Sequence, residues 1–387
     1  MENILGEKKI EKFIEDSKDN LYIEDTFGRL LIYGNYPNFN IGEFISGIPI
    51  SIKGKLDQKG IFIFDDYLFY SDGINNEKND EEKKNNENNN NISSSIKIEK
   101  EIGNNINNRK NLILFISNLN FGDNHMGIKS SIRTLLIDFI QNQNNMNNNL
   151  YNLSKRICRV ILVGNSLNTF ENEIEKKLNF DISSLSLKEI NEKIINNYAS
   201  FNKFLNIISN YVYIDVMPSI DCIDDLKFPQ KPLNKLLFTE NISNINLSSL
   251  KFVTNPYFFN VYIPFSNKKR YFAGTSGENI KIIKQYSSLE NNIEVMKKNI
   301  EWRHFCPINP SYSILYSLDS KTDPLLINNI PDVYFTSGNK ELKYEKIQIY
   351  NKEVFLLSLP DFNKTSKCVL FNYEDDSIRE IDFSLDF

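Results

Sequence analysis

The side chains of this chain that could do metal chemistry are few, and the first of them follow a hydrophobic strand predicted at 111–116. At the end of this strand the chain reads Ser-Asn-Leu-Asn-Phe-Gly (117–122), and only two histidines, His125 and His304, occur in the whole sequence. A two-metal site needs carboxylates and imidazoles, because two divalent ions about 3.5–4 Å apart repel each other and anionic ligands must offset that repulsion. Asn118 and Asn120 are neutral amides, so the loop has the position of a metal site without its ligands.

Neighbouring strands should end beside this loop, because sites in open α/β folds form at the carboxyl ends of strands. The expected strand ends are Ser117–Gly122, Gly164–Ser166, Asp215–Asp221 and Phe335–Asn339. Asn165 is again neutral, His125 stands alone near the first loop, and His304 follows a predicted helix. A two-metal phosphodiesterase keeps Asp-x-His after such a strand. The sequence therefore predicts degenerate ligand positions at Asn118, Asn120 and Asn165, with no catalytic residue, no bound metal and no cofactor.

The elements before this loop divide into three stretches. Residues 1–20 contain a short charged segment that is predicted to be helical over 4–18, with Ile10, Phe13 and Ile14 on one face. Residues 21–71 hold strands predicted at 29–33, 43–55 and 60–70, separated by glycine turns, which favours a small β-barrel of the OB-fold type. Residues 72–110 are rich in Asn, Glu, Lys and Ser and are predicted to be a disordered loop.

After Asn111 strands and helices alternate, and then strands dominate. Apolar residues at helical spacing predict helices over 128–140, 187–208 and 289–302. The predicted strands are 112–116, 159–163, 211–217, 259–265, 270–273, 333–336, 347–350, 354–359, 368–372 and 378–383. This order predicts an α+β fold, in which residues 111–387 form a β-sandwich with helices on its outer faces.

Composition limits the class of protein. The chain has 387 residues, a formal net charge of −5 and 41% hydrophobic residues, which argues against nucleic-acid binding by net charge alone. It contains no apolar run long enough for a membrane span and no apolar signal region near Met1. The four cysteines are dispersed, so no zinc knuckle or redox pair is expected; Cys158 and Cys222 are predicted to be ordinary core thiols.

Several short motifs, in order from about Tyr22 to Phe387, carry a family resemblance. They are Glu24–Arg29, Phe64–Tyr67, Asp215–Pro218, Phe228–Leu233, Val253–Tyr257, Gly274–Asn279, Tyr286–Ser288, Arg303-His304, Lys321–Pro324, Val333–Phe335 and Leu359–Phe362. In these segments the chain resembles the small, B-type accessory subunits of replicative DNA polymerases, and the Thr-Asn-Pro-Tyr and Gly-Thr-Ser-Gly segments favour the delta type. Ser219 and Gln285 depart from the usual pattern.

The resemblance implies an OB-fold packed on a calcineurin-like phosphodiesterase domain that is catalytically inactive. It implies a scaffold in the nucleus that joins the carboxy-terminal domain of the catalytic polymerase subunit to a further accessory subunit, in lagging-strand elongation and repair synthesis. DNA would then be contacted through the complex, and no membrane would be involved. Archaeal relatives keep an active two-metal nuclease, whereas the missing ligands place this chain with the inactive branch.

Two other functions remain open on the residues themselves. One is an active metal-dependent phosphodiesterase, and the other is a single-strand-binding OB protein. The aromatic series Phe62, Phe64, Tyr67, Phe69 and Tyr70 could stack on bases, although the acidic Asp65-Asp66 favours strand core. Lys53, Lys55 and Lys59 could follow a phosphate backbone, but a solvated hairpin explains them as well. His304 is expected to be a structural hydrogen-bonding group, and Gly274–Asn279 a structural turn.

Overall fold

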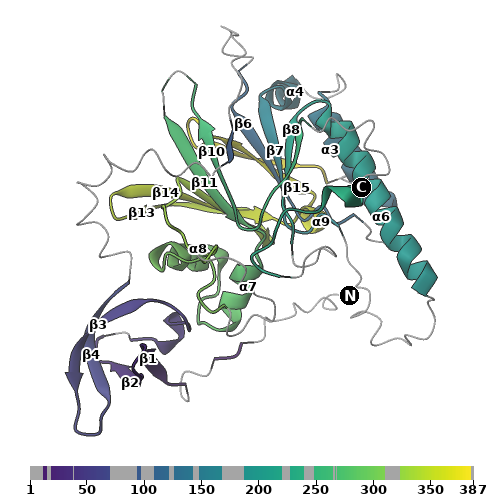
Figure 1. The fold of residues 1–387 in the computed structure, drawn as a ribbon. Coiled ribbons are helices and arrows are strands. Elements are labelled where there is room, and N and C mark those ends of the chain that lie inside the picture. Colours follow the sequence, from purple (N-terminus) through teal and green to yellow (C-terminus); the bar gives the residue numbers. More distant parts are fainter. Residues whose placement is uncertain are drawn as a thin grey trace, which may run out of the picture.

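The fold is seen in a computed structural model, whose described residues form three β-sheets and six α-helices of a mixed α/β protein (Figure 1). The structure describes residues 12–14, 19–37, 39–69, 94–96, 109–121, 126–142, 148–167, 187–219, 227–238, 248–264, 266, 268–309 and 323–384. Residues 12–14 are not helical, which contradicts the predicted helix there; the rest of 4–18, Cys222 and His125 lie outside the described residues.

The first sheet is formed by the amino-terminal part of the chain. Its strands are β1 (Leu21–Glu24), β2 (Arg29–Gly34), β3 (Ile50–Leu56) and β4 (Phe62–Phe69), in the order β1-β2-β4-β3. No pairing of β1 with β3 closes this sheet within the described residues, so the predicted barrel is not seen as a closed barrel. The predicted strand 43–55 is wrong at its start. Asn40 instead caps a 3-10 turn at Ile41–Glu43, its Oδ1 accepting from the Gly42 amide at 2.9 Å.

Aromatic side chains fill the inner side of this sheet. Phe64 is fully buried and Phe69 is 8% exposed. Tyr36, Phe39 and Phe44 surround Phe64 with ring centroids 5.9–6.5 Å away. These contacts favour the core interpretation of the aromatic series over a base-stacking platform; Tyr70 lies outside the described residues.

The second part of the chain forms two six-stranded sheets that face each other. One has the order β13-β14-β12-β11-β10-β5, and the other β16-β15-β6-β7-β8-β9. Their inner faces share an apolar core that includes Phe115 and Val163 from one sheet and Phe272 and Phe335 from the other. The strands are β5 (Ser94–Ile96), β6 (Leu112–Ser117), β7 (Ile157–Val163), β8 (Tyr213–Val216), β9 (Leu250–Phe252), β10 (Tyr257–Tyr262), β11 (Lys269–Thr275), β12 (Val333–Asn339), β13 (Lys343–Ile349), β14 (Lys352–Pro360), β15 (Lys367–Asn372) and β16 (Ile378–Asp382).

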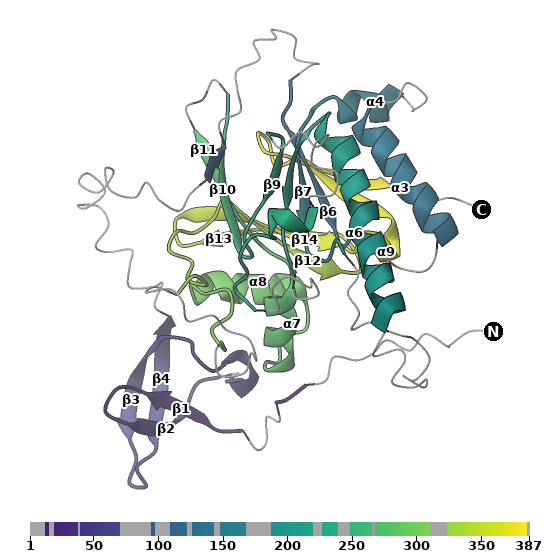
Figure 2. The ribbon, with the colours of Figure 1, turned by 45° about the vertical axis from the view of Figure 1, so that its right-hand side comes forward.

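Helices cover both outer faces of this sandwich (Figure 2). The face of β6–β9 carries α3 (Met126–Ile140), α4 (Asn148–Ser154) and α6 (Leu187–Ser209), whose buried residues share one core with the strands. The other sheet is covered by α7 (Glu278–Gln285) and α8 (Asn292–Glu301), and α9 (Phe362–Thr365) follows β14. The sandwich with outer helices is therefore confirmed. The prediction missed the short elements β1, β9, α4, α7 and α9, and also β5, which lies inside the predicted loop 72–110 and pairs with β10.

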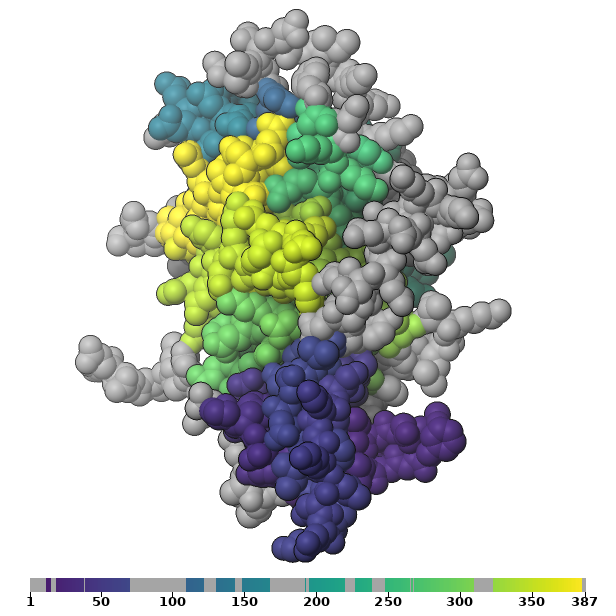
Figure 3. All heavy atoms as spheres, turned by 90° about the vertical axis from the view of Figure 1, so that its left-hand side faces the viewer, coloured from purple at the N-terminus to yellow at the C-terminus, as the bar shows by residue number. Residues whose placement is uncertain are grey.

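The amino-terminal sheet packs on α7, α8 and the segment after α8. Ile45 and Phe69 belong to the same buried cluster as Ile283 and Met296 of these helices. The Ser288 amide also donates to the Gly42 carbonyl at 2.7 Å. Figure 3 shows the purple amino-terminal residues directly against the green residues of this region. None of the helices in the described residues is long and apolar enough to cross a membrane.

Three buried or half-buried thiols allow a test of the core. Cys158, Cys306 and Cys368 are free, and burial raises the pKa of Cys158 and of Cys306 to about 12. Burial also raises the pKa of Cys368. On a Cys222→Ser background, we expect a thiol reagent to leave the native chain unmodified near neutral pH and to modify all three thiols in urea.

The same thiols should make stability fall in alkali. Above about pH 8.5, the ordinary thiol pKa, the unfolded thiols ionise while the folded ones stay protonated. We therefore expect the free energy of unfolding, measured by denaturant titration, to decrease as the pH rises from there toward about 12. Native-state modification at the rate of a free thiol would contradict the burial on which both expectations rest.

Candidate functional site at the strand ends

The carboxyl ends of strands from both sheets meet at Gly164. This glycine has φ +80, and a Cβ built on it would lie 2.8 Å from Asn118 Oδ1 and 2.8 Å from Ser337 Oγ. The Ser276 carbonyl would be 3.4 Å away. The loops after β6, β7 and β11 and the last residues of β12 therefore converge on one place. The strand order of the sequence predicts this for three of the four expected strand ends.

Asn118 holds the loops after β6 and β7 together. Its backbone is left-handed, with φ 54, a conformation that asparagine tolerates better than most residues. Its side-chain Oδ1 accepts from the backbone N–H of Asn165 at 3.1 Å. Its own backbone N–H donates to the Val163 carbonyl at 3.1 Å. This side-chain oxygen, at a position where the sequence predicts a degenerate metal ligand, joins the two loops by a hydrogen bond.

Asn120 and Asn165 complete this arrangement. The backbone of Asn120 is also left-handed, with φ 49, and its N–H donates to the backbone carbonyl of Asn165 at 3.1 Å. The structure thus brings together the three asparagines that sequence analysis singled out. Within the described residues, no group of three or more His, Cys, Asp or Glu side chains is placed to hold a metal ion.

An arginine that no sequence pattern predicts at this site lies against the same loop. Arg133 of α3 donates from Nη2 to the Asn120 carbonyl at 2.9 Å. Its guanidinium carbon lies 4.4 Å from the centre of the Phe121 ring. Because a fixed positive charge at this loop repels a divalent cation, Arg133 works against metal binding. No spacing rule connects position 133 with the loop, and its only signal is that it is the sole arginine of α3.

A second hydrogen-bond network borders the site from the β10 side. Asn255 is fully buried and donates from Nδ2 to Gln230 Oε1 at 2.8 Å and to Ser276 Oγ. Ser276 Oγ in turn donates to Glu278, and its carbonyl accepts from Ser337 Oγ at 2.6 Å. Except for Ser337, these residues come from motifs of the family resemblance, so three of those motifs here form a structural network. Gly274–Asn279 is only partly the predicted turn, because α7 begins at Glu278.

The carboxylate of the third strand lies inside the sandwich. Asp215 is fully buried in β8, where its Oδ2 is 2.5 Å from Arg159 Nη1 and accepts from the Tyr257 hydroxyl at 3.0 Å. Burial opposes the charge on Arg159, but Asp215 and Tyr257 outweigh it and raise the pKa of the guanidinium. Asp215 therefore stabilises the core and is not offered to a ligand at the strand end.

His304 is held on both sides of its ring. Its Nδ1 accepts from the Cys306 amide at 2.9 Å, so the proton is on Nε2, which lies 2.9 Å from Asp323 Oδ2. Neither ring nitrogen contacts one of the three asparagines. This geometry is that of the structural hydrogen-bonding group expected from the sequence.

Comparison with known proteins now adds the family. A family model that describes the B subunits of DNA polymerases alpha and epsilon matches residues 113–345, which is more than half of the 387 residues. The chain belongs to this family. The match covers the sandwich from β6 to β13 and includes the loops that meet at Gly164, so the site described above is that of a B-type subunit.

Individual relatives agree with this assignment. The DNA polymerase delta small subunit of Oryza sativa subsp. japonica is 24% identical over 370 residues, which cover 95% of this chain and 75% of the relative. That of Arabidopsis thaliana is 26% identical over 371 residues, covering 95% and 73%. An archaeal phosphodiesterase of known structure aligns with 70% of this chain and 98% of its own, at 13% identity and a TM-score of 0.30, a likeness too low to support an argument.

Proposed function

We propose that this chain is a non-catalytic accessory subunit of DNA polymerase delta. The observation that carries the proposal is its similarity to delta small subunits over nearly its whole length, within the B-subunit family. As a scaffold in the nucleus, the chain joins the carboxy-terminal domain of the catalytic subunit to a third accessory subunit. It serves lagging-strand elongation and repair synthesis there and contacts DNA through the complex.

We further propose that the sandwich is a calcineurin-like phosphodiesterase domain, residues 111–387, whose metal site has been lost. Three neutral amides at its strand ends and the guanidinium of Arg133 beside them support this proposal. The four-stranded sheet of residues 21–71 is then an OB-fold that packs on this domain. Residues 1–20 and 72–110 are its amino-terminal segment and its species-specific insertion.

Co-expression with the carboxy-terminal domain of the cognate catalytic subunit tests the scaffold. We expect the two chains to co-elute as a stable complex in size-exclusion chromatography, and the chain alone to be poorly soluble because apolar interface is then exposed. Two separate peaks from soluble partners would refute the scaffold proposal.

Turnover by the same complex tests the lost site. With manganese and a chromogenic phosphodiester we expect no hydrolysis above that of the catalytic domain alone, because the asparagines provide no anionic ligand. Robust turnover that a chelator abolishes would favour the alternative function, an active phosphodiesterase.

A further inference from the structure

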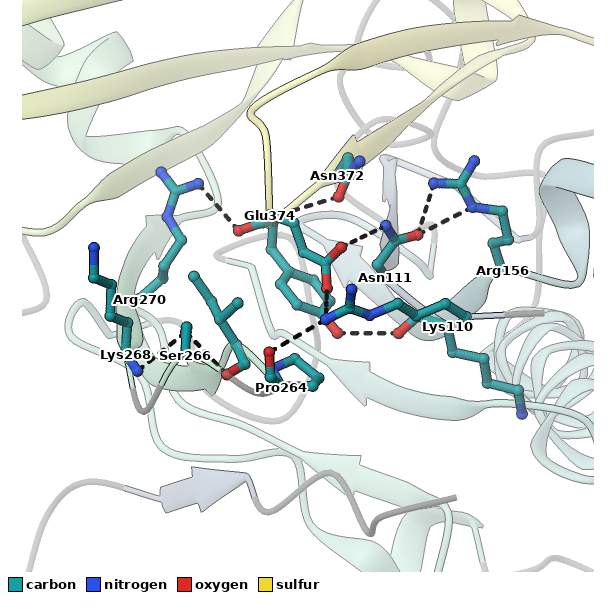
Figure 4. Close-up of polar contacts among 12 residues, drawn as sticks. Lys110, Asn111, Arg156, Pro264, Ser266, Lys268, Arg270, Asn372 and Glu374 are labelled. Carbon is teal, nitrogen blue, oxygen red and sulfur yellow. Dashed lines mark hydrogen bonds and ion pairs between the residues drawn. The ribbon is translucent and has the colours of Figure 1, made fainter. Parts of the chain in front are cut away.

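The end of the sandwich opposite the three asparagines carries a network that ties together segments far apart in the sequence (Figure 4). Asn111, just before β6, donates from Nδ2 to Glu374 Oε2 at 3.0 Å. Glu374 Oε1 lies 2.9 Å from Arg109 Nη2, which also donates to the Pro264 carbonyl at 3.2 Å. The strand start, the β10–β11 loop and the β15–β16 turn are thereby fixed to one another.

Carboxylates neutralise two arginines of this network. Glu374 pairs with Arg109, and Asp376 pairs with Arg270. Arg270 Nη1 also donates to the Tyr373 carbonyl at 3.2 Å, and the Tyr373 hydroxyl donates to the Lys110 carbonyl at 3.0 Å. These contacts hold the backbone from which the neighbouring lysine side chains project.

Five further cations at this end have no carboxylate partner within the described residues. We call them the basic end: Lys110, Lys155, Arg156, Lys268 and Lys269. Arg156 donates from Nε and Nη2 to the neutral Asn111 Oδ1, at 3.1 and 2.9 Å. Lys155 Nζ lies 4.0 Å from the centre of the Tyr151 ring. Lys110, Lys268 and Lys269 are exposed.

Charge therefore accumulates locally on a chain that is acidic overall. Asp376 also pairs with Lys346, which in turn pairs with Glu353. Within the described residues, the basic end with Arg109, Arg270 and Lys346 has eight cations against Glu353, Glu374, Asp375 and Asp376, a surplus of 8 − 4 = +4, whereas the whole chain carries −5. Tyr262 is 43% exposed and is the cross-strand partner of Lys269 in the β10–β11 register, so the two side chains project from the same face of this strand pair. This is a suitable surface for a polymer with regularly spaced negative charges.

We propose that the basic end binds the phosphate backbone of DNA directly, without reading its sequence. The lysines supply point charges that release counterions from the polymer, and the network beneath keeps them at fixed positions. The inference goes beyond the scaffold function, in which the chain reaches DNA only through its partners. It also places the contact on the sandwich and not on the lysines of the amino-terminal sheet.

Titration of a fluorescein-labelled DNA duplex with the full chain in complex with the carboxy-terminal domain of the catalytic subunit, followed by anisotropy at several salt concentrations and compared with that domain alone, tests this proposal. The variant is Lys110→Gln, Lys268→Gln and Lys269→Gln together, three exposed side chains that make no hydrogen bond or ion pair with the described residues. We expect its affinity at low salt to fall at least tenfold. The slope of log K against log salt should shrink by about 2 to 3, since each lost phosphate contact contributes about 0.9.

The matched control is Lys53→Gln, Lys55→Gln and Lys59→Gln, which removes the same charge from exposed positions of the amino-terminal sheet. It should bind the duplex as the unaltered chain does. Equal losses in both variants, or no salt-dependent binding by the unaltered chain, would overturn the proposal, as would binding of polyglutamate but not DNA. Both variants should still co-elute with the catalytic domain, so failure here leaves the scaffold proposal intact.

Discussion

Replacing Gly47 with alanine is expected to lower the free energy of unfolding by about 3 kcal/mol or more, combining left-handed strain with overpacking. Gly47 has φ +88, and a Cβ added there would lie 2.0 Å from the Pro307 carbonyl oxygen and 2.9 Å from its carbon. Both are backbone atoms and cannot rotate away. The alanine therefore pushes the amino-terminal sheet off the segment after α8, which urea unfolding and protease sensitivity of that sheet would report.

Gly60→Ala is the matched control for this variant. Gly60 has φ +80, but a Cβ there meets nothing within 4 Å. It should show only the cost of a left-handed alanine, about 1–2 kcal/mol. If Gly47→Ala lowers the free energy of unfolding no more than Gly60→Ala does, the amino-terminal sheet does not pack closely on the segment after α8.

Asp215→Ala is expected to be the most damaging loss of a single charge, at about 3–5 kcal/mol, because it leaves the guanidinium of Arg159 buried and unpaired. The Arg159 side chain is 12% exposed and that of Asp215 fully buried. Tyr257 loses its acceptor as well. Denaturant unfolding of the purified variant measures the effect.

An exposed ion pair serves as the control for the buried pair of Arg159 and Asp215. Lys346 Nζ and Glu353 Oε1 are 3.2 Å apart with side chains 44% and 60% exposed, so Glu353→Ala should cost less than about 1 kcal/mol. The double variant Arg159→Met, Asp215→Leu should recover much of the stability lost in Asp215→Ala, because it removes both buried charges. A small effect of Asp215→Ala alone would show that the pair is open to water.

The long periodic elements of the fold could be predicted from the sequence, and the short ones could not. Helices α3 and α6 and strands such as β6 and β7 have periodic apolar residues, and many of these, such as Leu136, Phe201 and Val160, are buried in one core. Helix α7 was not predicted because its N-cap residue, Gly277, has φ 94 and no side chain that could form a capping hydrogen bond. The sequence therefore shows no capping signal before this helix. The start of β3 was misplaced because the Asn40 cap and the Gly47 turn interrupt an apparently continuous strand. Both depend on distant segments, since Asn40 donates to Ser288 and Gly47 packs against the Pro307 carbonyl.

Some features of the candidate site could likewise be predicted from the sequence, and others could not. The meeting of the loops that contain Asn118 and Asn165 follows from the parallel pairing of β6 with β7, which the strand order predicts. The role of Asn118 in joining the two loops, the position of Arg133 and the burial of Asp215 depend on contacts between residues far apart in the sequence. Local pattern contains no information about such contacts.

The shared core of Ile45 and Phe69 with α7 and α8 has a consequence for how the molecule loses its structure. The amino-terminal sheet and the sandwich with its helices each cover apolar side chains of the other. Unfolding should therefore be a single cooperative event with one transition midpoint. A partner that binds either part then protects both from unfolding, since ligand binding to the native state shifts the common equilibrium.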